Sequence, residues 1–249
     1  MDAAKYLKRI GYAGPVEPTV DCLRKLHISH LRTVPFENLD INLERPIVLN
    51  DESLYEKIVE RRRGGFCYEL NGLFARLLTE LGFTVTKLTA GVANQQGEFG
   101  PYFDHMALRV ELARPWLVDV GFGDSFLEPL LLDEQGEQAD QTGVYRIDHY
   151  SDHLILMRRV EDREWKAEYR FLPQSYQYED YLEMCQYHQT SPESPFTRGR
   201  LCSIATEEGR ITLRDMRLIT TVRGEKREQL LTTDKEYATY LLENFGVVL

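Results

Sequence analysis

Residues 62–71 read Arg-Arg-Gly-Gly-Phe-Cys-Tyr-Glu-Leu-Asn, and this stretch predicts the point where a loop becomes a helix. Its two adjacent glycines allow the backbone to turn sharply before Cys67. Apolar residues then follow at three- and four-residue steps, as on the buried stripe of a helix: Leu70, Leu73, Phe74, Leu77, Leu78 and Leu81. Because Gly82 stands where a C-terminal cap would be, we expect Cys67 in the first turn of a helix that ends there.

Cys67 itself has two interpretations. Unpaired N–H groups and the helix dipole stabilise negative charge at a helix N-terminus, so a thiol placed there would lose its proton more easily. The thiolate is the reactive form of cysteine, which favours a nucleophile. Alternatively, Cys67 is a small buried hydrophobe, the usual role of a free cysteine. The local pattern leaves both interpretations open.

A nucleophilic cysteine needs a base within hydrogen-bond reach and a further group that orients the base. His105 begins segment 105–112, whose polar–apolar alternation predicts a half-buried strand with His105 on the face opposite the apolar residues. His27 and His30 lie three residues apart on a predicted helix over about 19–34, but no third ligand follows at the spacing of a zinc site. We therefore predict that His105 is the base, and we expect no metal site.

Asp119 interrupts the apolar run 116–120, which predicts a buried strand. An ionised carboxylate is costly there unless it is paired and hydrogen-bonded, so Asp119 should either cap local structure or orient a buried imidazole. A two-residue turn at 113–114 would place Leu108 opposite Asp119 and put His105 on the other face of the sheet. A His105–Asp119 pair therefore requires a longer connection, a bulge or another route.

Gly121-Phe122-Gly123 follows the predicted Asp119 strand directly. Glycines allow a backbone to approach a ligand closely and expose N–H donors, although an ordinary strand-to-loop turn is the commoner reason for such a tripeptide. The position beside the predicted Cys–His–Asp set favours the ligand interpretation here. Aromatic residues usually lie in the core rather than in a pocket, so residue type alone favours a core location for four further residues: Phe36, Tyr102, Phe103 and Phe196.

Length and composition agree with a soluble enzyme. The 249 residues include 30 basic and 40 acidic side chains, and the net charge of −10 argues against nonspecific binding to nucleic acid or to an anionic membrane. The N-terminus lacks the apolar core of a signal peptide, and no apolar run is long enough to span a bilayer. The four cysteines, at 22, 67, 185 and 202, show no paired spacing, which is typical of reduced thiols in the cytoplasm.

The predicted elements divide the chain into regions of an α+β protein. Residues 1–82 are mainly helical, 83–172 are mainly strands, 173–199 form a connection with a helix over 179–187, and 200–249 return to short strands and a final helix. The individual expectations are a helix that Asp51 could cap, strands over 84–93, 105–112, 116–120, 153–160 and 165–171, a hairpin turn at 223–225, and a helix from Asp234 to Gly246.

Several ordered motifs carry a resemblance to a known family. They are Arg-Gly-Gly-Phe-Cys-Tyr-Glu-Leu-Asn at 63–71, Asp-His-Met at 104–106 and Leu-Val-Asp-Val-Gly-Phe-Gly at 117–123, with matching segments at 6–11, 34–40 and 191–197. Together they resemble the arylamine N-acetyltransferase family over most of the first 200 residues, and the last fifty residues match more loosely. The resemblance implies an N-terminal helical bundle, a central antiparallel β-barrel and a C-terminal α/β lid around a cysteine-protease-like core.

The resemblance also implies a reaction. Cys67, His105 and Asp119 take the family's nucleophile, base and orienter positions without substitution. An acetyl group would move from the co-substrate acetyl-coenzyme A, through an acetyl-cysteine intermediate, to the nitrogen of an arylamine or arylhydrazine. The protein would have no bound cofactor. The cleft for the substrates would be bordered by Phe36, Tyr102, Phe103, Gly121, Phe122, Gly123, Phe196 and Thr197.

Five polar residues near these motifs are predicted to be buried structural groups: Glu37, Asn38, Arg63, Glu69 and Asn71. Two other classes of protein remain open on the residues alone. A Cys-His-Asp hydrolase or a transglutaminase-like acyl transferase would use the same triad. A non-catalytic binding module would leave it unused. Trapping of an acetyl group on Cys67 and a surface for coenzyme A distinguish these alternatives.

Overall fold

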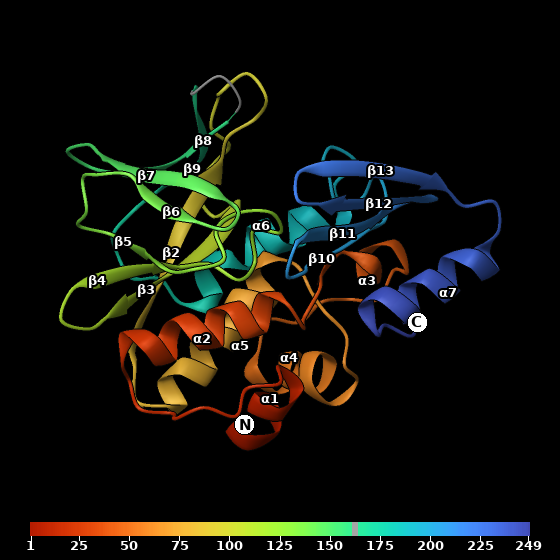
Figure 1. The fold of residues 1–249 in the computed structure, drawn as a ribbon, viewed down its shortest axis with the longest axis horizontal. Coiled ribbons are helices and arrows are strands. Elements are labelled where there is room, and N and C mark those ends of the chain that lie inside the picture. Colours follow the sequence, from red (N-terminus) through yellow and green to blue (C-terminus); the bar gives the residue numbers. More distant parts are fainter. Residues whose placement is uncertain (161–163) are drawn as a thin grey trace.

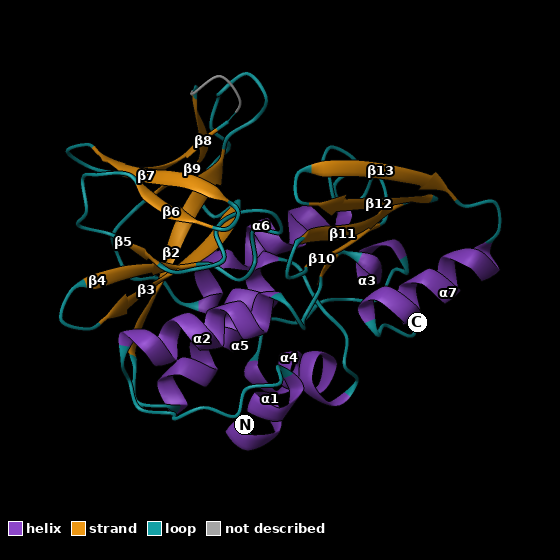
Figure 2. Cartoon of the chain, viewed as in Figure 1, coloured by secondary structure: helices purple, strands orange, loops and turns teal. Residues whose placement is uncertain are grey.

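The computed structural model describes residues 1–160 and 164–249, and its elements form three groups around the predicted motifs. Figure 1 shows a group of N-terminal helices below, an antiparallel barrel-like sheet at the upper left, and a second sheet with the C-terminal helix at the right. Figure 2 shows most of the helices gathered beneath the barrel-like sheet, and along the chain helices and strands are largely segregated rather than alternating. The predicted α+β class with a helical bundle, a barrel and a lid is confirmed.

The helical group is built around one central helix. Its members are α1 (Ala3–Arg9), α2 (Val20–Leu31), α3 (Leu39–Asn42), α4 (Asp51–Tyr55), the π-helical turn η1 (Glu56–Glu60) and α5 (Cys67–Glu80). In α5 the predicted apolar stripe is buried, and Leu70, Leu73 and Phe74 have no exposed surface. The cap of α4 differs from the prediction, because the side chain of Asn50 rather than Asp51 accepts the hydrogen bond, from the N–H of Ser53.

The barrel is a sheet of eight antiparallel strands in the order β5-β4-β3-β2-β9-β8-β7-β6. The strands are β2 (Thr84–Val92), β3 (His105–Glu111), β4 (Pro115–Val118), β5 (Leu130–Leu131), β6 (Gln138–Asp140), β7 (Gly143–His149), β8 (Leu154–Arg159) and β9 (Trp165–Phe171). The two faces of β3 pack into different hydrophobic cores. Met106, Leu108 and Val110 pack against the helices, whereas Ala107 packs inside the barrel.

The β3–β4 register resolves the conflict between His105 and Asp119. Leu108 pairs with Val118 and Glu111 with Pro115, so the connection is residues 112–114, one residue longer than a two-residue turn. A shift of one residue exchanges the faces of a strand. Continued by one residue, the register places Asp119 beside Ala107, on the same face as His105. The longer connection is thus the route that the pair requires.

The lid is a sheet of five strands in the order β1-β10-β11-β12-β13. They are β1 (Phe36–Glu37), β10 (Leu201–Ala205), β11 (Gly209–Arg214), β12 (Arg217–Val222) and β13 (Glu225–Leu230), followed by α7 (Asp234–Phe245). The predicted hairpin is confirmed, with Val222 paired to Glu225, and Gly246 ends α7 in the left-handed region at φ 65°. Because β1 comes from the N-terminal group, the sheet ties both ends of the chain together.

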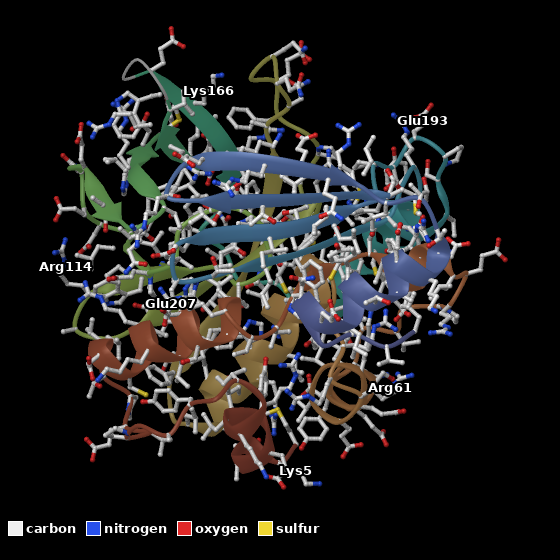
Figure 3. The ribbon with its side chains drawn as sticks, turned by 45° about the vertical axis from the view of Figure 1, so that its right-hand side comes forward. Lys5, Arg61, Arg114, Lys166, Glu193 and Glu207 are labelled. Atoms are coloured by element: carbon white, nitrogen blue, oxygen red, sulfur yellow. The ribbon has the colours of Figure 1, made fainter. Side chains whose placement is uncertain are left out.

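Helix α6 (Tyr178–Thr190) connects the barrel to the lid and packs against α5. Exposed charged side chains such as Arg114, Lys166 and Glu193 extend outward from the molecule in Figure 3. Among residues 1–160 and 164–249, no helix combines the length and the apolar character that crossing a membrane would require.

Candidate active site

Cys67 is the first residue of α5, as predicted, and only 3 % of its surface is exposed. The side chain of Glu69 reaches back to accept the N–H of Phe66 at 3.0 Å, which fixes the turn before the helix. As the first helical residue, Cys67 has a backbone N–H without an intrahelical partner. The sulfur therefore lies at a rigid helix start, where backbone donors are available.

His105 and Asp119 form a buried pair. His105 Nε2 lies 2.7 Å from Asp119 Oδ2, and both residues are at most 3 % exposed. The second ring nitrogen, Nδ1, makes no hydrogen bond with any described residue (1–160 and 164–249). The imidazole is consequently oriented by the carboxylate, and one nitrogen remains available for chemistry.

Asn71 and Gly121 bring the helix start and this pair together. Asn71, one turn after Cys67, donates from Nδ2 to Met106 O at 2.6 Å and to Asp119 Oδ1 at 2.8 Å, and its Oδ1 accepts the Val120 N–H at 2.9 Å. Gly121 lies so close that a Cβ there would be 2.8 Å from Cys67 Cα. Only glycine allows this approach. The three predicted catalytic residues thus belong to one tightly packed unit.

Burial and the neighbouring polar groups have opposite effects on the pKa values of Asp119 and Cys67. Burial alone would raise the pKa of Asp119, but the charge of His105 and the hydrogen bonds from His105, Asn71 and Gly121 hold that pKa below its usual range. Burial raises the pKa of the Cys67 thiol, and the nearby backbone N–H of Met106 lowers it only in part. Desolvation is therefore the largest effect on the pKa of this thiol, and it opposes the stabilisation of negative charge expected at a helix start. A thiolate at this site requires a proton acceptor beside it.

Comparison with known proteins places this geometry in a family. The family model described as N-acetyltransferase matches residues 19–249. An arylamine N-acetyltransferase of Escherichia coli K12 is 36 % identical over 97 % of this chain and 87 % of its own.

The chain belongs to the arylamine N-acetyltransferase family.

Solved structures of the arylamine N-acetyltransferase family share the whole fold. The enzyme of Mycobacterium marinum in complex with CoA superposes with a TM-score of 0.91 at 35 % identity, covering 99 % of this chain and 93 % of the other. The Salmonella typhimurium enzyme gives a TM-score of 0.93 at 31 % identity, covering 98 % and 90 %. By this membership the protein is an acetyltransferase enzyme.

In this family member the Gly121-Phe122-Gly123 loop encloses the pair. The Phe122 ring meets the His105 ring edge-on, with centroids 5.3 Å apart. A Cβ added to Gly123, whose φ is +95°, would lie 3.5 Å from the Phe36 ring, so the loop passes close to this ring. Phe196 packs 6.2 Å from Phe36 and 5.6 Å from Phe66, measured between ring centroids. These contacts build an aromatic wall of Phe36, Phe122 and Phe196 around the start of α5.

The three other side chains predicted to border the cleft, those of Tyr102, Phe103 and Thr197, make contacts with neighbouring segments of the chain. Tyr102 lies under the Arg170 guanidinium, 4.7 Å from its ring centroid. The Phe103 ring packs edge-on between Tyr176 and Tyr181, at 5.1 and 5.3 Å. The Thr197 hydroxyl is used within its own loop, where it donates to the carbonyls of residues 191 and 194.

Sequence reasoning missed His27 as a part of this site. His27 is fully buried on α2, and its Nε2 accepts the backbone N–H of Asp119 at 3.1 Å. Since Nδ1 is engaged with Leu127 O at 2.7 Å, the ring has no nitrogen left for a metal. Among residues 1–160 and 164–249 no group of three or more metal-ligating side chains occurs. The only signal in the sequence was a polar residue on the buried stripe of an amphipathic helix.

The five predicted buried polar residues are all at most 4 % exposed. Three of them join two further residues in an ion cluster beneath the start of α5. Lys57 Nζ lies 2.7 Å from Glu69 and 2.8 Å from Asp40, and Arg63 lies 2.8 Å from Glu37 and 3.0 Å from Asp40. We call Glu37, Asp40, Lys57, Arg63 and Glu69 the ion cluster. It connects η1, the Gly64-Gly65 turn and the first turn of α5.

A cavity of about 660 Å³ opens between the barrel and the lid, next to the glycine loop. Its volume is in the range of small-molecule sites. Asp124, which follows Gly123, contributes to its wall together with Arg158 of β8 and Arg210 of β11. The remaining lining residues are Leu127, Gln141, Thr142, Thr206, Glu207, Glu208, Gly209, Thr221, Arg223 and Gly224.

Proposed function

We propose that this protein transfers an acetyl group from acetyl-coenzyme A to the nitrogen of an aromatic amine or hydrazine through an acetyl-Cys67 intermediate. The observation that carries the proposal is the buried His105–Asp119 pair beside a cysteine at a helix start. Membership of the arylamine N-acetyltransferase family and the CoA complex of the M. marinum relative support it.

The first half-reaction acylates the enzyme. His105 Nδ1 takes the proton of the Cys67 thiol while the sulfur attacks the thioester carbonyl. When the tetrahedral intermediate collapses, the bond from carbon to the coenzyme sulfur breaks and His105 returns its proton to the leaving thiolate. The Cys67 backbone N–H is a suitable donor to the developing oxyanion. Exchange of one thioester for another is close to isoenergetic, so positioning is the main task of the protein.

The second half-reaction releases the product. The nitrogen of the acceptor attacks the acetyl carbon, and His105 Nδ1 takes a proton from that nitrogen. The carbon–sulfur bond then breaks, and the proton passes to Cys67, which restores the resting thiol. Asp119 stabilises the imidazolium that forms in each half-reaction, since its carboxylate is ionised and 2.7 Å from Nε2.

Two surfaces suit the two substrates. The aromatic wall of Phe36, Phe122 and Phe196 offers apolar contact to an aromatic acceptor. The cavity between barrel and lid is large enough for part of coenzyme A, and Arg158, Arg210 and Arg223 line it. All four cysteines are free and buried, which accords with the proposed cytoplasmic location.

Mass spectrometry of the intact protein tests the nucleophile. After exposure to acetyl-coenzyme A, we expect one acetyl group on Cys67, which persists in buffer and disappears when an aromatic amine is added. Cys67→Ala should remain unmodified. Cys22→Ala is the matched control, because Cys22 is also 3 % exposed, and it should be acetylated like the wild type. Acetylation of Cys67→Ala at the wild-type rate would refute the proposal.

Steady-state kinetics test the order of events. A single thiol that carries the acetyl group between substrates gives parallel double-reciprocal lines at several amine concentrations. Intersecting lines would indicate direct transfer in a ternary complex. Rapid loss of the acetyl group to water without an amine would indicate a hydrolase instead.

A further inference from the structure

His27 lies behind the catalytic pair and touches two parts of the chain that the pair depends on. Its Nε2 accepts the N–H of Asp119, at 3.1 Å, and its Nδ1 donates to the carbonyl of Leu127, at 2.7 Å. These two residues bracket the glycine loop, whose Phe122 ring contacts His105. One imidazole on α2 therefore holds both ends of the segment that carries the orienting carboxylate.

The hydrogen-bond roles at His27 are determined by its partners. A backbone N–H can only donate, so Nε2 must be the unprotonated nitrogen. A carbonyl can only accept, so Nδ1 carries the hydrogen. The ring is thus a neutral imidazole in one tautomer, and burial, which lowers the pKa of His27, favours that neutral form. Phe126 stacks on the ring at 5.7 Å and 6°, which fixes its plane.

We propose that His27 is a positioning residue for the acyl transfer: its neutral imidazole clamps the backbone of Asp119 and Leu127 and so aims the Asp119 carboxylate at His105. This inference rests on the proposed function, because it assigns His27 to the reaction that Cys67, His105 and Asp119 perform. Because His27 is fully buried and both of its ring nitrogens bind backbone groups, it acts through the backbone of Asp119 and Leu127.

His30 provides the comparison that separates positioning from burial. It lies on the same helix and is equally buried, and its Nε2 hydrogen-bonds with the hydroxyl of Tyr6 at 3.0 Å. Its ring packs on Phe74 with centroids 5.1 Å apart. Within residues 1–160 and 164–249, none of its hydrogen bonds or ring contacts involves Cys67, His105 or Asp119. A loss that follows from removing any buried imidazole of α2 should therefore appear at both positions, whereas a loss of positioning should appear at His27 alone.

Two substitutions at His27 test its two hydrogen bonds separately. The amide of His27→Gln reaches the place of Nε2 and can still accept the Asp119 N–H through its oxygen. The shorter amide of His27→Asn reaches the place of Nδ1, keeps the bond to Leu127 and leaves the Asp119 N–H buried without a partner. His30→Gln and His30→Asn are the matched controls.

The measurement is the single-turnover rate constant of Cys67 acetylation at saturating acetyl-coenzyme A, with the folded fraction of each variant taken from circular dichroism. We expect His27→Asn to slow acetylation about tenfold or more, a change equivalent to ~1.4 kcal/mol in the barrier, without a matching rise in the KM for acetyl-coenzyme A. We expect His27→Gln to stay within about threefold of the wild type, and both His30 variants to acetylate at the wild-type rate once corrected for folded fraction.

The opposite results would overturn the inference. They are equal rates in folded His27→Asn and His30→Asn, or a tenfold loss in folded His27→Gln. The Gln variant keeps the test decisive if His27→Asn does not fold. Failure of the proposed function is distinguishable, since in that case the wild type itself would not form acetyl-Cys67.

Discussion

Two buried assemblies of charged groups flank the start of α5, and they are built differently. On one side, His105 and Asp119 form a single pair with one ring nitrogen left without a hydrogen bond to residues 1–160 and 164–249. On the other side, each cation of the ion cluster binds two carboxylates. Lys57 pairs with Asp40 and Glu69, and Arg63 pairs with Glu37 and Asp40.

The difference shows how buried charge can serve chemistry or architecture. In the ion cluster burial raises the pKa of Glu69. Lys57 nevertheless stays charged among three carboxylates, because their charges outweigh the desolvation that would lower its pKa. Every charge is satisfied, and the backbone is held in place. In the catalytic pair one imidazole nitrogen makes no hydrogen bond with residues 1–160 and 164–249, and in the proposed reaction it accepts the proton of the Cys67 thiol.

We expect the largest effect from a substitution in the catalytic pair. Asp119→Asn preserves shape but removes the charge that stabilises the imidazolium and can fix the wrong tautomer of His105. We expect turnover to fall by up to about four orders of magnitude, with the fold retained. The assay is steady-state acetylation of an aromatic amine, with circular dichroism as the control. Near-normal turnover in folded Asp119→Asn would show that the carboxylate is merely structural.

The second prediction breaks the ion cluster. Lys57→Met leaves the Glu69 and Asp40 carboxylates without their shared cation, and we expect a loss of ~3–5 kcal/mol in the free energy of unfolding. The measurement is urea denaturation. Adding Glu69→Gln should recover part of the loss, because the amide oxygen can still accept the Phe66 N–H without a charge. Unchanged stability in Lys57→Met would mean that the cluster contributes nothing to the fold.

The third prediction concerns the close approach between helix and glycine loop. In Gly121→Ala the new methyl group would lie 2.8 Å from Cys67 Cα and 2.7 Å from Asn71 Nδ2, so the loop must shift. We expect a stability loss of ~1–3 kcal/mol and slower acetylation of Cys67. Gly136→Ala is the control, since Gly136 is exposed and a methyl there meets only Glu134 at 3.4 Å. Equal behaviour of the two variants would contradict the predicted contact.

The fourth and smallest effect appears as a dependence on pH. Burial lowers the pKa of His30 well below its usual range. As the pH falls below about 6.5, the unfolded chain binds this proton and the folded one does not, so stability decreases towards acid. The slope from this group is at most ~1.4 kcal/mol per pH unit.

His30→Phe isolates that contribution. Between about pH 6.5 and 5, we expect the wild type to lose stability relative to the variant in urea denaturation at each pH. Taking the difference between the two proteins cancels the opposing influence of Glu168, whose pKa burial raises to about 7. Parallel stability curves would show that His30 is not held neutral in the folded state.

Much of the fold could be predicted because local patterns agree with the final structure. The predicted strand over 165–171 is β9, the turn at Arg223-Gly224 joins β12 to β13, and Gly246 ends the last helix. The two-residue strand β5 and the three-residue strand β6 were not predicted, because so few residues show no clear alternation. The longer strand β7 was not predicted either, although its residues alternate in burial from Tyr145 to Asp148. The π-helical turn over 56–60 was not predicted.

The candidate site could also be predicted only in part. Residue types in order along the chain were enough to select Cys67, His105 and Asp119 and to predict that five polar residues are buried. They did not predict the contacts of Tyr102 with Arg170 of β9 or of Phe103 with Tyr181 of α6, because these partners lie far away in the sequence. They also gave no reason to connect His27 with Asp119, which lies 92 residues away.

The sequence by itself determined the helix start at Cys67, the alternation that turns His105 away from the apolar face of its strand, and the motifs that identify the family. These depend on neighbours within a few residues, whose side-chain periodicity follows directly from the backbone. Tertiary structure alone decided the register that brings Asp119 to the face of His105, the addition of β1 to the lid sheet, and the raised pKa of the Cys67 thiol. Each of these depends on which distant groups exclude water and where the chain closes its connections, and that is a property of the packed molecule.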